Sequence, residues 1–227
     1  MIRRVLECVG VLGMIGMIGC GGGSSSSGTP TTPTATNRAP VINSITISPT
    51  FGISELTSFN YSASASDPDG DAVTYTWDLA GNPASGSNGS ITFVGGGTGT
   101  ARVTVTDSKG ATATDTRSFT VGSMSGNWTV TAPGYGTILL TLTQSGSFVT
   151  GSFSAPQGFG NAPPGSGGQT DPAEPGRIKP NGEVEIRLKV GRFLDFYLRG
   201  NMDQSGRQIA GGMFNSGFSG QPFTMVK

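Results

Sequence analysis

Three aspartates at alternate positions are the side chains of this sequence whose type and spacing could bind a metal ion. Asp67, Asp69 and Asp71 form a D-x-D-x-D run, and carboxylate oxygens are the ligands that Ca²⁺ takes in proteins. A calcium ion needs about six oxygens, so the run requires further ligands, and Asp107 is the candidate that completes it. The EF-hand template does not fit, because Gly70 holds the fourth place of the run where that template has glycine at the sixth.

The same residues also fit a plain β-turn. In Asp67-Pro68-Asp69-Gly70, proline presets φ, the aspartate side chains bond nearby amides and glycine takes a positive φ. Two interpretations therefore stay open: a turn alone, in a chain without a cofactor, and a turn that also holds Ca²⁺. Asp78 is a further carboxylate close in sequence.

Other residues that could do chemistry lack the partners that catalysis requires. The chain contains no histidine, so the usual general base of a serine nucleophile is missing. Ser219 lies in a GFSG sequence without nucleophile-elbow spacing, and the glycine-rich stretch 95–100 has no lysine and opens no helix, which excludes a phosphate loop. Glu183 and Glu185 alternate along one strand with basic residues, so we expect cross-strand surface pairs there. The sequence predicts no catalytic residues and no enzyme.

Residues 1–19 predict a secretory signal. Arg3 and Arg4 precede an apolar run that is too short to span a bilayer, which takes about 20 residues. The end of the run, Met17-Ile18-Gly19-Cys20, resembles the lipobox of bacterial lipoproteins, in which cleavage falls before the cysteine and its sulfur receives a diacylglycerol. The resemblance implies lipidation of Cys20, with fatty acyl chains such as palmitate attaching the protein to the membrane. An ordinary secretory signal and a retained apolar anchor are the alternatives.

Residues 20–38 predict a disordered tether. After Cys20 the stretch is rich in Gly, Ser, Thr and Pro and has no bulky apolar residue, so it cannot bury surface to offset the entropy of ordering. Gly21 stands where an aspartate would argue for retention in the inner membrane. The lipoprotein resemblance therefore implies an exported protein, anchored in the outer membrane of a two-membrane bacterium.

Residues 39–122 predict a small β-sandwich. Short segments in which apolar and polar residues alternate recur with turn residues between them, which is typical of antiparallel sandwiches. Strands are expected at 41–48, 56–65, 72–79, 91–94, 101–106 and 112–121. No segment has apolar residues at helical spacing over three turns, so the sequence predicts an all-β fold.

This region resembles the PKD and cadherin-like group of immunoglobulin-fold repeats found in bacterial surface proteins. The resemblance rests on Ala39-Pro40, on SDPDGD at 66–71, on YTWD at 75–78 and on VTVTD at 103–107. It departs from a PKD repeat after Asp78, where LAGN stands in place of FGDG. The resemblance implies an Ig-like fold with Trp77 as the buried aromatic residue of a central strand.

Residues 123–227 predict a second β domain, joined through a GSMSG hinge at 122–126. Alternating segments without a crossover helix favour a closed, antiparallel up-and-down β-barrel. Its inward residues are expected to include Trp128, Val130, Ile138, Leu140, Leu142, Phe148, Thr150, the aliphatics of 183–190, Leu194, Phe196, Leu198 and Met202. A Pro- and Gly-rich loop at 155–176 interrupts the pattern, and it is either disordered or placed beside the barrel mouth.

Short phrases of this second domain resemble small lipocalin-like barrels of bacterial exported proteins. They are GNWT at 126–129, LTLTQSG at 140–146, VTG at 149–151 and IAG at 209–211. The resemblance implies that Trp128 lies at the closed end of a barrel, whereas a core tryptophan of any β domain is the alternative. Trp128 and Phe159, the one large apolar residue of the loop, are the candidate ligand-binding residues.

The sequence therefore predicts a membrane-anchored exported lipoprotein that acts as a non-catalytic recognition or adhesion module for a protein or glycan. The alternative is a carrier that holds a small apolar molecule inside the barrel. The chain has 14 Lys and Arg against 14 Asp and Glu and no basic patch, so nucleic acid is not an expected partner.

Overall fold

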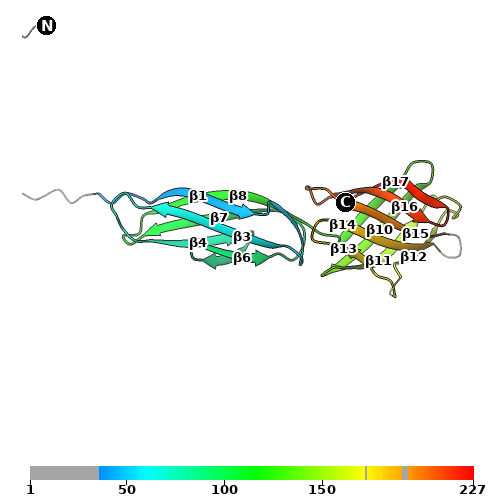
Figure 1. The fold of residues 1–227 in the computed structure, drawn as a ribbon, viewed down its shortest axis with the longest axis horizontal. Coiled ribbons are helices and arrows are strands. Elements are labelled where there is room, and N and C mark those ends of the chain that lie inside the picture. Colours follow the sequence, from blue (N-terminus) through cyan, green and yellow to red (C-terminus); the bar gives the residue numbers. More distant parts are fainter. Residues whose placement is uncertain (1–35, 172, 191–193) are drawn as a thin grey trace, which may run out of the picture. The chain divides into compact units, whose positions relative to one another are not determined.

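The computed structural model describes residues 36–171, 173–190 and 194–227, and within these ranges the chain is all-β, as predicted (Figure 1). Asn37–Lys227 form one compact unit. In the described ranges, no helix has the length and apolar character needed to cross a membrane. The predicted signal peptide, the lipidation site Cys20 and the tether up to residue 35 lie outside the described residues.

The first half of the described chain is an Ig-like sandwich of two sheets. One sheet has the order β1 (Val41–Ser48), β3 (Ser58–Ser66), β6 (Asn88–Thr92). The other has the order β2 (Phe51–Ile53), β8 (Thr112–Gly122), β7 (Gly97–Asp107), β4 (Val73–Leu79), β5 (Asn82–Ser85), with β2 parallel to β8. The predicted strands are present, and the short strands β2 and β5 were not predicted.

The sandwich core forms because alternate residues of these strands are apolar. In β3, Phe59, Tyr61 and Ala63 are buried while the residues between them are not. Phe59 packs against the rings of Phe93 and Phe119 at centroid distances of 5.2 and 5.4 Å. Trp77 on β4 is 4% exposed, which confirms its predicted place in the core. These contacts hold the two sheets together through apolar burial.

The second half is a closed antiparallel barrel. Its eight strands are β9 (Gly126–Ala132), β10 (Gly136–Ser145), β11 (Phe148–Ala155), β13 (Gly176–Ile178), β14 (Glu183–Val190), β15 (Leu194–Met202), β16 (Gln208–Asn215) and β17 (Phe218–Val226), and β17 pairs with β9 to close the ring. Each strand neighbours the next one along the barrel, so the up-and-down prediction is confirmed. Strand β12 (Ser166–Gln169) adds to the edge of β11.

In β11, the third strand of the barrel, the inward and outward side chains are exchanged relative to the prediction. Phe148 is 44% exposed and Thr150 is exposed, whereas Val149 and Phe153 are buried. Because side chains alternate between the faces of a strand, a shift of one residue exchanges its inner and outer sets. Predicting Phe148 and Thr150 as inward was therefore wrong.

The predicted hinge is a packed connection. Met124 is fully buried in the barrel core. Its N–H donates to Oε1 of Gln144 at 2.9 Å, and its carbonyl accepts from Nε1 of Trp128 at 2.8 Å. A linker with a buried apolar side chain and satisfied backbone groups does not act as an open hinge.

The described residues of the 155–176 segment are ordered, so the prediction of plain disorder is wrong for them. Strand β12 pairs with β11, and Phe159 and Ala162 form an isolated bridge with each other's backbone. Gly165 N–H donates to the carbonyl of Ala155. The segment folds because Phe159 buries its ring in the barrel core, an anchor that the surrounding Gly and Pro did not reveal.

Candidate cation site and outer face of the barrel

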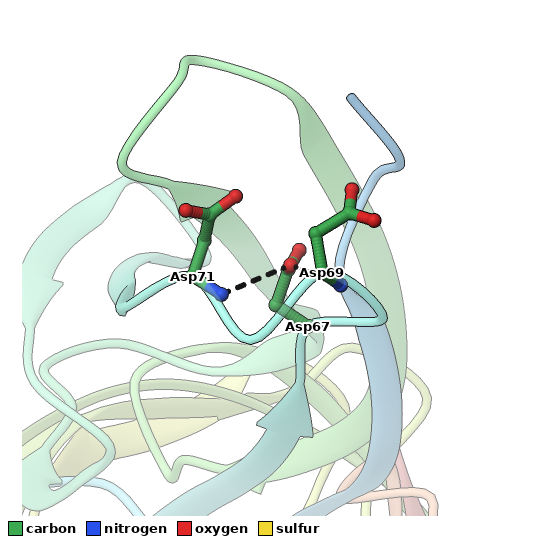
Figure 2. A group of neighbouring side chains, drawn as sticks. All are labelled: Asp67, Asp69 and Asp71. Carbon is green, nitrogen blue, oxygen red and sulfur yellow. Dashed lines mark hydrogen bonds between the residues drawn. The ribbon is translucent and has the colours of Figure 1, made fainter. Parts of the chain in front are cut away.

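The Asp67–Asp71 segment is the turn between β3 and β4, drawn in Figure 2. Oδ1 of Asp67 accepts the backbone N–H of Asp69 at 2.8 Å and that of Asp71 at 3.2 Å. Gly70 has a φ of 80°, and its N–H donates to the carbonyl of Asp67. One aspartate side chain therefore builds the turn, as the turn interpretation predicts.

The turn also gathers three carboxylates. One oxygen from each of Asp67, Asp69 and Asp71 lies within 4.8 Å of the other two. Oδ2 of Asp67 and Oδ1 of Asn37 are buried and have no hydrogen-bond partner among the described residues. Such oxygens are uncommon in folded proteins, and a hard cation is a partner that carboxylate and amide oxygens can share.

Two basic side chains neutralise part of this charge. The backbone N–H and Nε of Arg38 donate to Asp69 at 2.7 and 2.8 Å, and together they hold the pKa of Asp69 below its usual value. Nζ of Lys109 lies 2.9 Å from Oδ2 of Asp71, and this pair raises the pKa of Lys109. Both basic side chains are more than half exposed, so they can swing into solvent when a divalent cation enters.

Asp107 lies outside this group of three and is hydrogen-bonded to Asn37. Nδ2 of Asn37 donates to Oδ2 of Asp107 at 2.9 Å, and the N–H groups of Lys109 and Ala111 donate to Oδ1 at 2.8 and 2.9 Å. Burial raises the pKa of Asp107, but these hydrogen bonds outweigh burial and leave it below the usual value. Asp78 lies at the opposite end of β4, where Oδ1 accepts the N–H of Gly81, so it is not part of the group.

The donor set fits Ca²⁺ better than a softer metal. All of its members are oxygens, from carboxylates and an amide, and Ca²⁺ takes about six to eight such ligands, including waters. Asn37 precedes the first strand, so a bound cation would tie the end of the tether to the β3–β4 turn.

The two candidate ligand residues of the barrel are core residues at different positions. Trp128 is 1% exposed, and β10 places Leu140 opposite it. Phe159 is also 1% exposed, but its backbone bridges Gly136, the first residue of β10 and four residues before Leu140. The structure therefore does not bring Trp128 and Phe159 together.

Phe159 closes its end of the barrel with other aromatic rings. Its ring stacks on Phe196 at a centroid distance of 5.6 Å and an interplanar angle of 8°. Phe218 and Tyr135 lie 6.4 and 6.3 Å from it. This side chain fills space that a ligand would need.

The outward side chains of β13, β14 and β15 form a continuous polar surface, here called the Arg/Tyr face. Its members are Arg177, Glu185, Arg187, Asp195, Tyr197 and Arg199. Register places Phe148, Arg177, Glu185 and Arg199 in one row across four strands. Arg177 lies over the ring of Phe148 at 4.7 Å, and Arg199 lies 5.1 Å from the ring of Tyr197. Guanidinium groups therefore lie beside aromatic rings on this side of the barrel.

Arg187 is the centre of the Arg/Tyr face. Nε and Nη2 donate to the two oxygens of Asp195 at 2.9 and 2.7 Å, and Nη1 donates to Oε2 of Glu174. The hydroxyl of Tyr197 donates to the same Glu174 oxygen at 3.3 Å. The carboxylate of Asp195, followed by that of Glu174, raises the pKa of Arg187 far above the physiological range. Arg187 is therefore always charged and is fixed in direction.

A hollow of about 240 Å³ opens beside Arg187 and Tyr197. Its other lining residues are Ala173, Glu174, Pro175, Gly176, Arg177 and Glu185. Burial, then the charge of Glu174, raises the pKa of Tyr197, so its hydroxyl stays protonated. Nε of Arg199 lies 2.5 Å from Oε2 of Glu185, and Nζ of Lys179 lies 2.8 Å from Oε1 of Glu183. The predicted cross-strand pair is confirmed for Glu185, whereas Glu183 pairs with Lys179 of the preceding turn, and the two glutamates do not form a carboxylate pair.

Two residues of these sites were missed by sequence reasoning. Asn37 was assigned to the tether, although an amide side chain just before the first strand can reach the turns at that end of the sandwich. Glu174 was assigned to the loop, and its partners Arg187 and Tyr197 are 13 and 23 residues away. That contact depends on how the segment before β13 lies against β14 and β15, for which the sequence has no periodic signal.

Comparison with known proteins identifies the first domain. Residues 37–121 match the family model of the PKD domain. The PKD1 domain of Vibrio anguillarum Epp is 32% identical, with 38% of this chain and 96% of that domain covered at a TM-score of 0.32. The PKD1 domain of the Vibrio cholerae metalloprotease PrtV is 24% identical, with 37% and 98% covered at a TM-score of 0.31.

A solved structure of carbohydrate-binding modules from the β-sandwich superfamily is 16% identical, with 78% of this chain and 61% of that chain covered at a TM-score of 0.36. No curated protein matches this chain.

Proposed function

We propose that this chain, whose residues 37–121 form a PKD domain, is an exported, lipid-anchored protein that presents a non-catalytic recognition module. Cys20 carries the lipid, the tether follows it, and the PKD domain is a spacer that bears the barrel. The barrel recognises a protein or a glycan through the Arg/Tyr face. The expected location is the outer membrane of a two-membrane bacterium.

The observation that supports recognition is the composition of the Arg/Tyr face. A surface that serves only solubility carries scattered charges on mobile side chains. Here Arg187 is held by Asp195 and Glu174, with a side-chain exposure of 18%, and aromatic rings lie beside three arginines. Fixed donors next to rings are typical of binding surfaces, because little side-chain entropy is lost on contact.

The packing of the barrel interior favours this function over a carrier. Fully buried Trp128, Phe159, Phe196 and Leu140 occupy the space inside the strands. A barrel of eight strands is just wide enough for side chains to fill it. A carrier would need an apolar cavity in the same volume.

Calcium is a proposed stabilising cation rather than a catalytic one. The oxygens of Asn37, Asp67, Asp69 and Asp71 would hold it, with Asp107 orienting Asn37. When bound, Ca²⁺ would supply charge neutralisation and a link between the tether and the PKD domain.

The test of the recognition function uses the full chain, purified in detergent, on defined arrays of glycans and of bacterial surface proteins. We expect specific binding that the double variant Arg177→Ala/Arg199→Ala weakens and that Arg117→Ala, in an exposed ion pair of the PKD domain, leaves unchanged. Equal binding by the wild type and the barrel variant would contradict recognition through this face.

A further inference from the structure

We infer that the hollow beside Arg187 and Tyr197 binds one ring of a neutral, hydroxyl-rich ligand, namely a sugar unit of an uncharged glycan. The inference rests on the proposed recognition function and specifies its site and ligand class. The residues that carry it are Glu174, Arg177, Glu185, Arg187 and Tyr197.

The size of the hollow limits the ligand to a small group. Its volume of about 240 Å³ lies below the range of about 300 to 1,000 Å³ for pockets that enclose drug-sized molecules. One sugar ring suits this volume, whereas a folded protein surface would contact the rim and leave the hollow unfilled. The rest of a glycan chain can extend over the neighbouring row of Arg177, Glu185 and Arg199.

The charges that line the hollow balance one another. Two guanidinium groups, of Arg177 and Arg187, face two carboxylates, of Glu174 and Glu185. Arg187 is engaged by Glu174 and Asp195, and Glu185 is engaged by Arg199. An anionic ligand at Arg187, or a cationic ligand at Glu174, would have to break the Arg187–Glu174 pair, which is costly because the Arg187 side chain is only 18% exposed. A neutral ligand breaks none.

The paired groups nevertheless keep hydrogen-bonding capacity. A guanidinium group has five N–H donors, and three of those on Arg187 are engaged by Asp195 and Glu174. Each carboxylate oxygen can accept two hydrogen bonds. Donors and acceptors therefore lie side by side around the hollow, and a sugar hydroxyl, which both donates and accepts, can use both kinds.

The ring of Tyr197 supplies the apolar contact that a sugar also needs. Tyr197 lines the hollow, and Arg187 and Arg199 lie 5.8 and 5.1 Å from its ring. The flanking guanidinium groups fix the ring, so little freedom remains to be lost when the C–H surface of a sugar packs against its edge. Tyr197 is therefore expected to be the main anchor of the ligand.

The test titrates the full chain in detergent with neutral hexose oligosaccharides and with uronate oligosaccharides. We expect the neutral set to bind, with an affinity that changes little between about 0.05 and 0.5 M salt, because no new ion pair forms. Tyr197→Ala should lower that affinity about tenfold, as for a typical aromatic anchor, and Tyr197→Phe, which keeps the ring, should retain most of it. Glu174→Gln should gain affinity for uronates, because it removes the carboxylate that Nη1 of Arg187 binds, and the matched control Glu183→Gln should change neither preference.

Every other outcome overturns the inference. The first three would leave the proposed recognition function standing, and the last would contradict it as well. Stronger binding of uronates by the wild type, lost at high salt, would show a charged ligand while recognition stands. Binding of neutral oligosaccharides that is unaffected by Tyr197→Ala would place the site elsewhere on the protein. Binding to surface proteins alone on the arrays would retain recognition and exclude a glycan ligand. No binding to any array member would contradict both.

Discussion

Arg187 on β14 and Asp195 on β15 lie diagonally across the two strands, where Arg187 is opposite Tyr197, and form a two-pronged ion pair with Nε to Oδ1 at 2.9 Å and Nη2 to Oδ2 at 2.7 Å. The guanidinium group is the main cause that holds the pKa of Asp195 below its usual value. The pair sets the direction of Arg187 and, through it, the position of Glu174. The loop that carries Glu174 is thereby attached to the barrel wall.

The first prediction follows from the sign of this pKa shift. A depressed carboxyl pKa in the folded state contributes stability that is present above the unfolded pKa of about 3.9 and is lost as pH falls through the folded pKa. Thermal melting should therefore show that Asp195→Asn lowers the Tm at pH 7, and that the difference from wild type shrinks as the pH falls below the unfolded pKa of about 3.9. A difference that stays constant over that range would contradict the ion pair as its cause.

The second prediction concerns calcium. Ca²⁺ at about 100 times its Kd should raise the free energy of unfolding by about 2.7 kcal/mol, because it binds the folded chain and not the unfolded one. Calorimetric melting with Ca²⁺ and then with chelator measures the shift. Asp67→Asn should abolish it, while Asp115→Asn, in an exposed ion pair on β8, should retain it. If the melting midpoint of the wild type does not change with Ca²⁺, the calcium site is excluded and only the turn interpretation remains.

The third prediction concerns the aromatic end of the barrel. Phe159→Ala should lower the free energy of unfolding by about 3 kcal/mol, because a fully buried ring leaves a cavity between Phe196 and Phe218. Phe148→Ala, at a 44% exposed phenylalanine of the same barrel, should cost about 0.5 kcal/mol. Urea denaturation of the two variants measures the contrast. Equal losses would mean that the segment around Phe159 does not close the barrel.

The fourth prediction concerns the membrane anchor. Cells grown with labelled palmitate should label this protein through Cys20, and two or three acyl chains should keep it in the membrane fraction. Cys20→Ser should lose the label and leave the membrane fraction. Labelling that persists in that variant would assign the anchor to another residue.

Regular alternation explains which parts of the fold could be predicted from sequence. In β14, charged and aliphatic residues alternate strictly, so its outer face and its ion pairs followed directly from the period of a strand. Trp77 was predictable for a similar reason, since it stands on the apolar side of a strand with Val73 and Tyr75. The family match to residues 37–121 agrees with the motifs that suggested a PKD domain.

Long-range packing explains what could not be predicted. The turn before Phe148 sets the phase of β11, and both Phe148 and Val149 are apolar, so the sequence fits either phase. Phe159 lies among Gly and Pro without periodicity, and its order comes from the rings it meets. Asn37 and Glu174 join their sites across 70 and 13 residues, a separation at which one sequence gives no pairing signal.

Hydrogen–deuterium exchange on the full chain, with and without the array ligand that binds best, tests the central claim most directly. The account predicts that the ligand slows exchange in segments 173–178, 185–190 and 194–199, which contain the Arg/Tyr face. It also predicts unchanged exchange in the PKD domain and in β9 and β10. Slowing confined to the PKD domain, or to the strands on the other side of the barrel, would contradict recognition through that face.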